Sequence, residues 1–133
     1  MSVLLDRQFL FTRLVCQWGL ECFKRGYFLK LRETGLLETR TVELDGRRPK
    51  ARDRVHSGTD STRGGTHYMQ LSTDVELFYK DGNGTLVYIT DGDDPRWVEL
   101  GELWESLDPL CRWGGRFGSR DSNHISITYE GRA

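Results

Sequence analysis

Two short stretches of this sequence carry side chains that could bind a metal ion and activate water. The first runs from Gly65 to Asp74 and contains His67, and the second is Asp121-Ser122-Asn123-His124. Together they supply two of the three histidines of the chain and two carboxylates. Two neutral imidazoles and one carboxylate suit catalytic zinc, because they leave a fourth position open for water. The remaining carboxylate could act as a general base beside that water.

The spacing of these residues restricts how each stretch can fold. His67 and Asp74 are seven residues apart, so on one helix they would lie about 10 Å apart along the axis, too far for one metal ion. On one straight strand their side chains would point to opposite faces. We therefore predict that His67 lies in a bend and Asp74 on the strand that follows. Asp121 and His124 are three residues apart and can share a site from a turn.

These stretches resemble the motifs of a family of zinc peptidases that act on peptidoglycan. The family includes D-Ala-D-Ala carboxypeptidases, vancomycin-resistance dipeptidases and phage L-alanyl-D-glutamate endopeptidases. Its first motif, S-x-H-x-x-G-x-A-x-D, is similar to this sequence at His67 and Asp74, and its second, an acidic residue followed after two spacers by histidine, at Asp121 and His124. The run Trp113-Gly114-Gly115-Arg116-Phe117 also resembles a Trp-Gly-Gly run of the phage members.

The chain departs from the first motif at three positions. Gly65, Gln70 and Ser72 stand where the motif has Ser, Gly and Ala. None of these positions carries a metal ligand in the motif, so the departures concern the conformation of the loop more than its chemistry.

The resemblance implies a role for each polar residue of the motifs. His67, Asp74 and His124 would bind Zn²⁺, and Asp121 would be the general base. An alternative ligand set replaces Asp74 by His56, the one histidine outside the motifs. A surface histidine in a loop is the simpler interpretation of His56, because Asp74 already has the spacing of the family.

Three further residues are candidates for contacts with the substrate. Arg40 belongs to an Arg-Thr pair that resembles one in the family, where the arginine contacts the substrate and the polarised carbonyl. The alternative for Arg40 is a solvated arginine in a charged loop. Trp113 and Tyr68 are expected to line the substrate groove, and the alternative for both is packing inside the protein.

The pattern of apolar residues predicts an α+β fold in a single domain of residues 1–133. Apolar residues three, four and seven apart predict helices at about 6–24 and 95–106. We expect these two helices to pack on a small antiparallel sheet that carries the zinc site, which the resemblance describes as a DD-peptidase/Hedgehog-like fold. Alternating residues and turn signals predict the strands, and the remaining long stretches are expected to be irregular. The expected strands cover 27–32, 71–79, 85–90 and a last strand from 124, and the expected loops cover 33–65 and 110–118.

Composition limits the partners and the location. Acidic and basic residues nearly cancel to a net charge of -1, which favours neither nucleic acid nor an anionic membrane as a partner. The three cysteines include no metal-type C-x-x-C pair and are expected to be buried, reduced thiols. Charged residues such as Asp6 and Arg7 interrupt the apolar N-terminus, so no signal peptide is predicted. We expect a monomer without membrane insertion or a separate wall-binding domain, cytoplasmic until it is released to the cell wall.

The expected activity is hydrolysis of an amide bond in the peptidoglycan stem peptide by a phage or prophage endolysin. The aspartate at position 121, the Trp113-Gly114-Gly115 run and the small size resemble the L-alanyl-D-glutamate endopeptidases, which implies the L-Ala–D-Glu bond. Two alternatives remain open at this point. One is a D,D-carboxypeptidase of the same fold, and the other is a non-enzymatic phage structural or wall-binding module.

Overall fold

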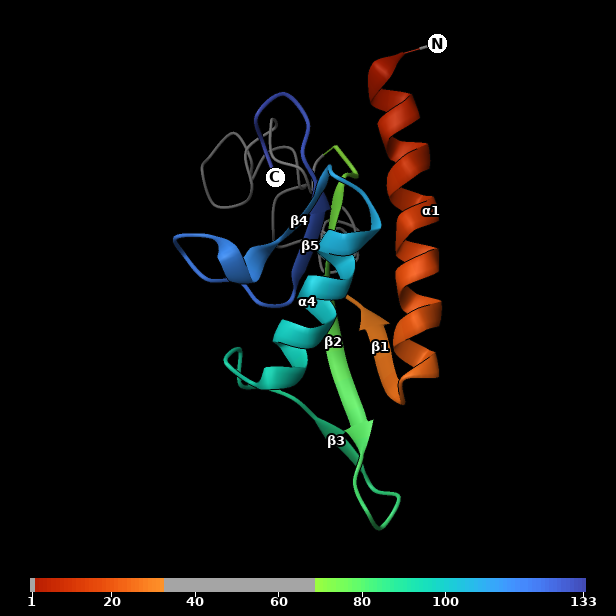
Figure 1. Ribbon diagram of the computed structural model, residues 1–133, viewed down its shortest axis with the longest axis vertical. Coiled ribbons are helices and arrows are strands. Elements are labelled where there is room, and N and C mark those ends of the chain that lie inside the picture. Colours follow the sequence, from red (N-terminus) through yellow and green to blue (C-terminus); the bar gives the residue numbers. More distant parts are fainter. Residues whose placement is uncertain (1, 33–68) are drawn as a thin grey trace, which may run out of the picture.

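A computed structural model describes residues 2–32 and 69–133 (Figure 1). In this part of the chain, two helices pack on a small antiparallel sheet, so the α+β class and the two main helices predicted from the sequence are confirmed. The elements in chain order are α1 (Val3–Lys24), β1 (Tyr27–Leu31), β2 (Ser72–Lys80), β3 (Leu86–Tyr88), α4 (Pro95–Leu107), β4 (Cys111–Trp113), the short 3-10 helix η1 (Gly114–Arg116) and β5 (His124–Ile127).

Both helices begin at capping residues that their sequences provide. The Ser2 hydroxyl accepts a hydrogen bond from the Leu5 amide at 3.0 Å, so α1 begins a few residues before the expected position. Asp94 caps α4 by accepting from the Arg96 amide at 2.9 Å, and Pro95 occupies the first turn as predicted. Gly26, with φ of 91°, follows the end of α1 and turns the chain into β1.

The sheet is organised around β2, which has different neighbours on its two edges. β1 pairs with one edge, with Leu29 opposite Leu77. The other edge is shared, because β5 pairs with its first half and β3 with its second half, where Tyr79 lies opposite Val87. β4 adds a strand beyond β5. In Figure 1, β3 and β5 lie at opposite ends of β2, and the edge between them forms a fork.

The core lies on the face of the sheet that α1 and α4 cover. Trp18 of α1 and Trp104 of α4 are both fully buried, and their rings meet edge to face with centroids 5.8 Å apart. Each indole N–H has a carbonyl acceptor: Trp18 donates to Leu100 at 2.9 Å, and Trp104 donates to Arg112 and Ser126 at 3.0 Å.

Two details of the sequence prediction need correction. Residues 110–118 were expected to form only a loop, but Cys111–Trp113 is the strand β4, paired with β5. Three residues are too few for a period-two pattern to be recognised, and the pairing depends on a distant strand. The return strand of the hairpin is also shorter than expected, Leu86–Tyr88 rather than 85–90, because the chain leaves β2 toward α4.

Candidate metal and catalytic site

Asp74 and His124 are brought together by the pairing of β2 with β5. They lie directly opposite each other in the antiparallel register, so their side chains share one face. Because side chains alternate along a strand, this face is opposite to the one where Val75 and Ile125 join the core. The distance between His124 Nδ1 and Asp74 Oδ1 is 3.4 Å. The expected position of Asp74 on a strand is confirmed.

Asp121 joins this pair from the turn before β5. Its main-chain carbonyl accepts from the His124 amide at 3.0 Å, which closes the turn. Its carboxylate Oδ2 lies 4.0 Å from His124 Nδ1, and the side chain is 49% exposed, against 6% for His124. A half-exposed carboxylate beside a buried imidazole is accessible to water and to substrate, as a general base requires.

These three residues form a cluster that could hold a metal ion. One donor atom from each of Asp74, Asp121 and His124 lies within 4.8 Å of the other two. Two donors bound to one tetrahedral zinc ion at about 2.0–2.1 Å lie about 3.4 Å apart, which matches the separation of His124 and Asp74. A nitrogen and carboxylate oxygens also suit other first-row divalent ions, so the geometry supports a metal ion without identifying it.

Gly114 allows the Asp121 turn to approach the end of β4. A Cβ atom on Gly114 would lie 2.1 Å from the Asp121 carbonyl oxygen and 2.8 Å from the His124 Cβ, both impossible contacts. The Gly114 carbonyl accepts from the Asp121 amide at 3.0 Å and from the Phe117 amide at 3.1 Å. The Phe117 ring then packs against the His124 ring, with centroids 5.3 Å apart. The Trp-Gly-Gly run therefore positions the second motif.

Trp113 has a different role from the one predicted. It is only 3% exposed, so it cannot line an open substrate groove, and the alternative of packing holds. Its ring fills the space that Gly101 of α4 and Gly115 leave, because a Cβ atom on either glycine would lie 2.1 Å or 2.3 Å from the ring. Its N–H donates to the Ser122 carbonyl at 2.8 Å. Trp113 thus anchors the loop that carries Asp121 to the core.

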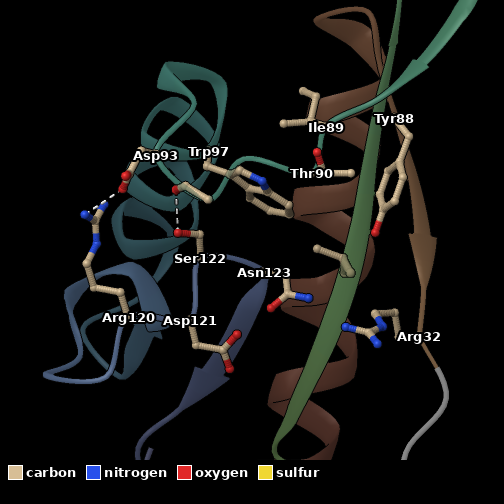
Figure 2. A pocket seen from close by; sticks show the side chains of 12 residues that line it. Arg32, Tyr88, Ile89, Thr90, Asp93, Trp97, Arg120, Asp121, Ser122 and Asn123 are labelled. Carbon is tan, nitrogen blue, oxygen red and sulfur yellow. Dashed lines mark hydrogen bonds and ion pairs between the residues drawn. The ribbon is translucent and has the colours of Figure 1, made fainter.

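Asn123 and Arg32 are site residues that the sequence interpretation missed. In the amide orientation that satisfies both neighbours, the Asn123 nitrogen donates to Asp121 Oδ1 at 2.5 Å. Its oxygen accepts from Arg32 Nη1 at 3.1 Å. Asn123 lies between Asp121 and Arg32 in Figure 2. Asn123 stood inside the second motif as a spacer, and Arg32 ended a predicted strand, so neither carried a signal of its own.

The bend that precedes β2 contains a residue with a strained backbone, Gln70, at the position where the first motif has glycine. Gln70 has φ of 59°, in the left-handed region that a side chain rarely adopts. Gln70 stands where the first motif has glycine, the residue that adopts this conformation without strain. The neighbouring Met69 carbonyl accepts from Gln8 of α1 at 2.8 Å, which ties the bend to the first helix.

Several predicted site residues lie outside the residues that the structure describes. They are His67, Tyr68, Arg40 and the alternative ligand His56, together with the expected loop 33–65.

The cysteines take no part in the cluster. Burial raises the pKa of the Cys22 thiol to about 12, and it raises the pKa of the Cys111 thiol to about 12. These two are inert core thiols, as expected. Cys16 is exposed, which corrects the expectation that all three would be buried.

Comparison with known proteins gives no relative from which to transfer a function. No family model matches the sequence, and no curated protein matches it significantly. Within residues 2–32 and 69–133, neither helix is long and apolar enough to cross a membrane. What the site can do must therefore be judged from its own geometry.

Proposed function

We propose that this chain is a zinc peptidase that hydrolyses the L-Ala–D-Glu bond of the peptidoglycan stem peptide, acting as a phage or prophage endolysin. The observation that carries the proposal is the convergence of Asp74, His124 and Asp121. Asp74 Oδ1 lies 3.4 Å from His124 Nδ1, a separation that suits two ligands of one metal ion. Asp121 Oδ2 lies 4.0 Å from the same nitrogen, and about half of the Asp121 side chain is exposed. This convergence agrees with the two motifs, which make Asp74 and His124 ligands and Asp121 the base.

The remaining parts of the proposal come from the sequence motifs. His67 is the third ligand by its spacing from Asp74, and Arg40 is the candidate cation for the oxyanion. The left-handed conformation of Gln70 supports the first motif, since the backbone keeps the shape for which the motif uses glycine. The fold is accordingly proposed to be DD-peptidase/Hedgehog-like.

Each residue of the site has a separate role in the proposed hydrolysis. Bound zinc would supply a Lewis acid that polarises the scissile carbonyl and makes water more acidic. Asp121 accepts a proton from the attacking water and delivers it to the leaving amine. Asn123 positions the Asp121 carboxylate by donating to its Oδ1.

The choice of bond rests on the resemblance to phage endopeptidases, with aspartate at position 121 and the Trp113-Gly114-Gly115 run. A D,D-carboxypeptidase would instead need a closed end that pairs with a terminal carboxylate. A non-enzymatic wall-binding module would not need a general base, so the half-exposed Asp121 beside the buried His124 favours the enzyme.

Two measurements test the proposal. Metal analysis of protein reconstituted with zinc should give one ion per chain. Mass spectrometry of digested muropeptides should then show a new N-terminal glutamate and glycan fragments bearing only L-Ala. Release of D-alanine with the L-Ala–D-Glu bond intact would identify a carboxypeptidase. Muropeptides that stay unchanged after treatment with zinc-loaded protein would favour the non-enzymatic binding module.

A further inference from the structure

A pocket opens in the fork where β3 and β5 separate along β2. Its volume is about 540 Å³, within the range of about 300–1,000 Å³ that small-molecule sites occupy. The core residues Val75 and Trp97 line it together with residues of the segment before α4 and of the turn before β5. In Figure 2, Trp97, Ser122 and Asn123 lie on one side of the β2 ribbon, and Tyr88 and Arg32 lie on the other.

The pocket shares Asp121 with the candidate site, whereas Asp74 and His124 are not among its lining residues. Asp121 and Asn123 line one end, and Tyr88 and Ile89 of the β3 side line the other. Asp121 is also the carboxylate 4.0 Å from His124. A molecule in the fork pocket therefore lies beside the proposed base, where a group that flanks the scissile bond would lie.

The charges of the fork pocket do not favour an anion. Arg120 is paired with Asp93 at 2.6 Å, and Arg32 faces Glu76 at 3.8 Å as well as the Asn123 amide. Both arginines that line the pocket thus have acidic neighbours. Asp121 would also repel a carboxylate of the stem peptide placed beside it.

The neutral polar groups of the pocket suit a neutral, polyhydroxylated ligand. The pocket presents the Tyr88 and Thr90 hydroxyls and the Asn123 amide, which offer both donors and acceptors. The residue Tyr88 is 48% exposed, and its ring stacks on Phe78 with centroids 4.9 Å apart, so one aromatic surface is held in place. An aromatic face beside neutral hydrogen-bonding groups fits the apolar face and the hydroxyls of a sugar ring.

We propose that the fork pocket binds an N-acetylated sugar residue of the glycan strand, which makes the chain selective for stem peptides still attached to glycan. This inference rests on the proposed function, because the glycan is joined to the L-Ala side of the bond that Asp121 would serve. The sugar in the pocket would hold the peptide in line with Asp121 and His124.

The first test compares two substrates. The kcat/KM of the wild type should be at least about tenfold higher for a disaccharide-linked stem peptide than for the same peptide after removal of the sugar. Tyr88→Ala should reduce this ratio by about three- to tenfold, the effect of losing one stacking surface, whereas Tyr88→Phe should keep most of it. Leu86→Ala is the matched control, since Leu86 lies on the same strand, is 53% exposed and lies outside the pocket. Equal kcat/KM for both substrates in the wild type would overturn the proposal.

A second test separates this inference from the proposed function. The reduced disaccharide of peptidoglycan, without peptide, should shift the NMR signals of Tyr88 and Thr90, and Tyr88→Ala should weaken binding. These shifts in a protein without hydrolytic activity would sustain the sugar pocket while the peptidase proposal fails. Shifts with the free stem peptide but not with the disaccharide would overturn the sugar pocket and assign it to peptide.

Discussion

The two faces of the sheet are built on the same strands but differ in how their buried polar groups are satisfied. On the face that α1 and α4 cover, the side chains are mostly apolar, and the indole of Trp18 has a carbonyl acceptor on Leu100. On the opposite face, Ser72 and Ser126 are buried and lie opposite each other. Within the described residues, neither hydroxyl has a hydrogen-bond partner.

This difference indicates that one face carries the apolar core and the other carries the candidate metal cluster. Asp74 follows Ser72 by two residues, and His124 precedes Ser126 by two residues. All four side chains therefore lie on the same face of the sheet, which is called the site face. A buried polar group without a partner costs about 1–3 kcal/mol, whereas apolar burial on the helix side supplies the stability that offsets it. Substitutions on the two faces should therefore have separable effects on stability and activity.

The largest expected effect is the loss of metal binding on the site face. His124→Ala removes a ligand, so metal content and hydrolysis should both be abolished while circular dichroism still reports a folded chain. Metal content is measured by atomic emission after gel filtration. His56→Ala is the control and should keep its metal. The reverse result, full metal in His124→Ala and none in His56→Ala, would favour the three-histidine alternative.

The next effect concerns the proposed base. Asp121→Asn keeps the size of the side chain but cannot accept a proton, so turnover should fall by about two to four orders of magnitude while the metal stays bound. Steady-state kinetics with metal analysis of the same sample measures both. Near-normal turnover would show that a different group, such as Glu130, is the base.

A substitution in the core should lower stability rather than act on the metal site. Leu77 is fully buried, and Leu77→Ala should lower the free energy of unfolding by about 2–5 kcal/mol in urea titrations. Its neighbour Glu76 points to the site face, and Glu76→Ala should change stability by less than about 1 kcal/mol. The division between the faces would be wrong if Glu76→Ala were the more destabilising of the two.

Removing a buried hydroxyl from the site face should stabilise the protein. Ser72→Ala leaves no polar group to satisfy and should raise the free energy of unfolding by about 1 kcal/mol. Ser122→Ala is the matched control, because its hydroxyl donates to the Gly92 carbonyl at 2.6 Å, and its loss should destabilise. Destabilisation by Ser72→Ala would mean that its hydroxyl has a partner in the folded protein.

The smallest expected effect is a pH dependence of stability that involves Glu99 on the surface of α4. The Tyr27 hydroxyl donates to Glu99 at 2.7 Å and, with Arg25, holds the pKa of this carboxyl below its ordinary value. A lowered pKa in the folded state stabilises the protein above the ordinary pKa of glutamate, and the gain is lost as the pH falls through the folded-state value. Thermal denaturation should show wild type slightly above Glu99→Gln at pH 7, with the difference disappearing under strongly acidic conditions. A constant difference across this range would contradict the assignment.

Local signals in the sequence were sufficient for much of the fold. The pair Asp94-Pro95 predicted the start of α4, and the Asp81-Gly82-Asn83-Gly84 turn predicted the hairpin between β2 and β3; both are confirmed. These features depend on a few neighbouring residues. The strand β4 could not be predicted because its three residues are defined by their partner β5.

The candidate site divides in the same way. The spacing of Asp74, Asp121 and His124 predicted that these residues converge, and the structure brings them together. For Trp113 the alternative of packing holds, and the sequence could not decide it because the space for its ring is provided by Gly101 on a different element. The hydrogen bonds of Asn123 depend on Arg32, which is distant in sequence, and no local pattern reports such a contact.

The direct opposition of Asp74 and His124 would make metal binding at the candidate cluster depend on the register of β2 and β5. A slip of one residue between β2 and β5 would place one of these side chains on the core face, and the pair would no longer meet. Unfolded chains cannot hold this pair together, so every bound ion stabilises the paired strands by mass action. The apo protein should therefore be the form most easily unfolded and cleaved by proteases of the host. Under the proposed function, the protein would owe part of its stability, as well as its activity, to the bound ion.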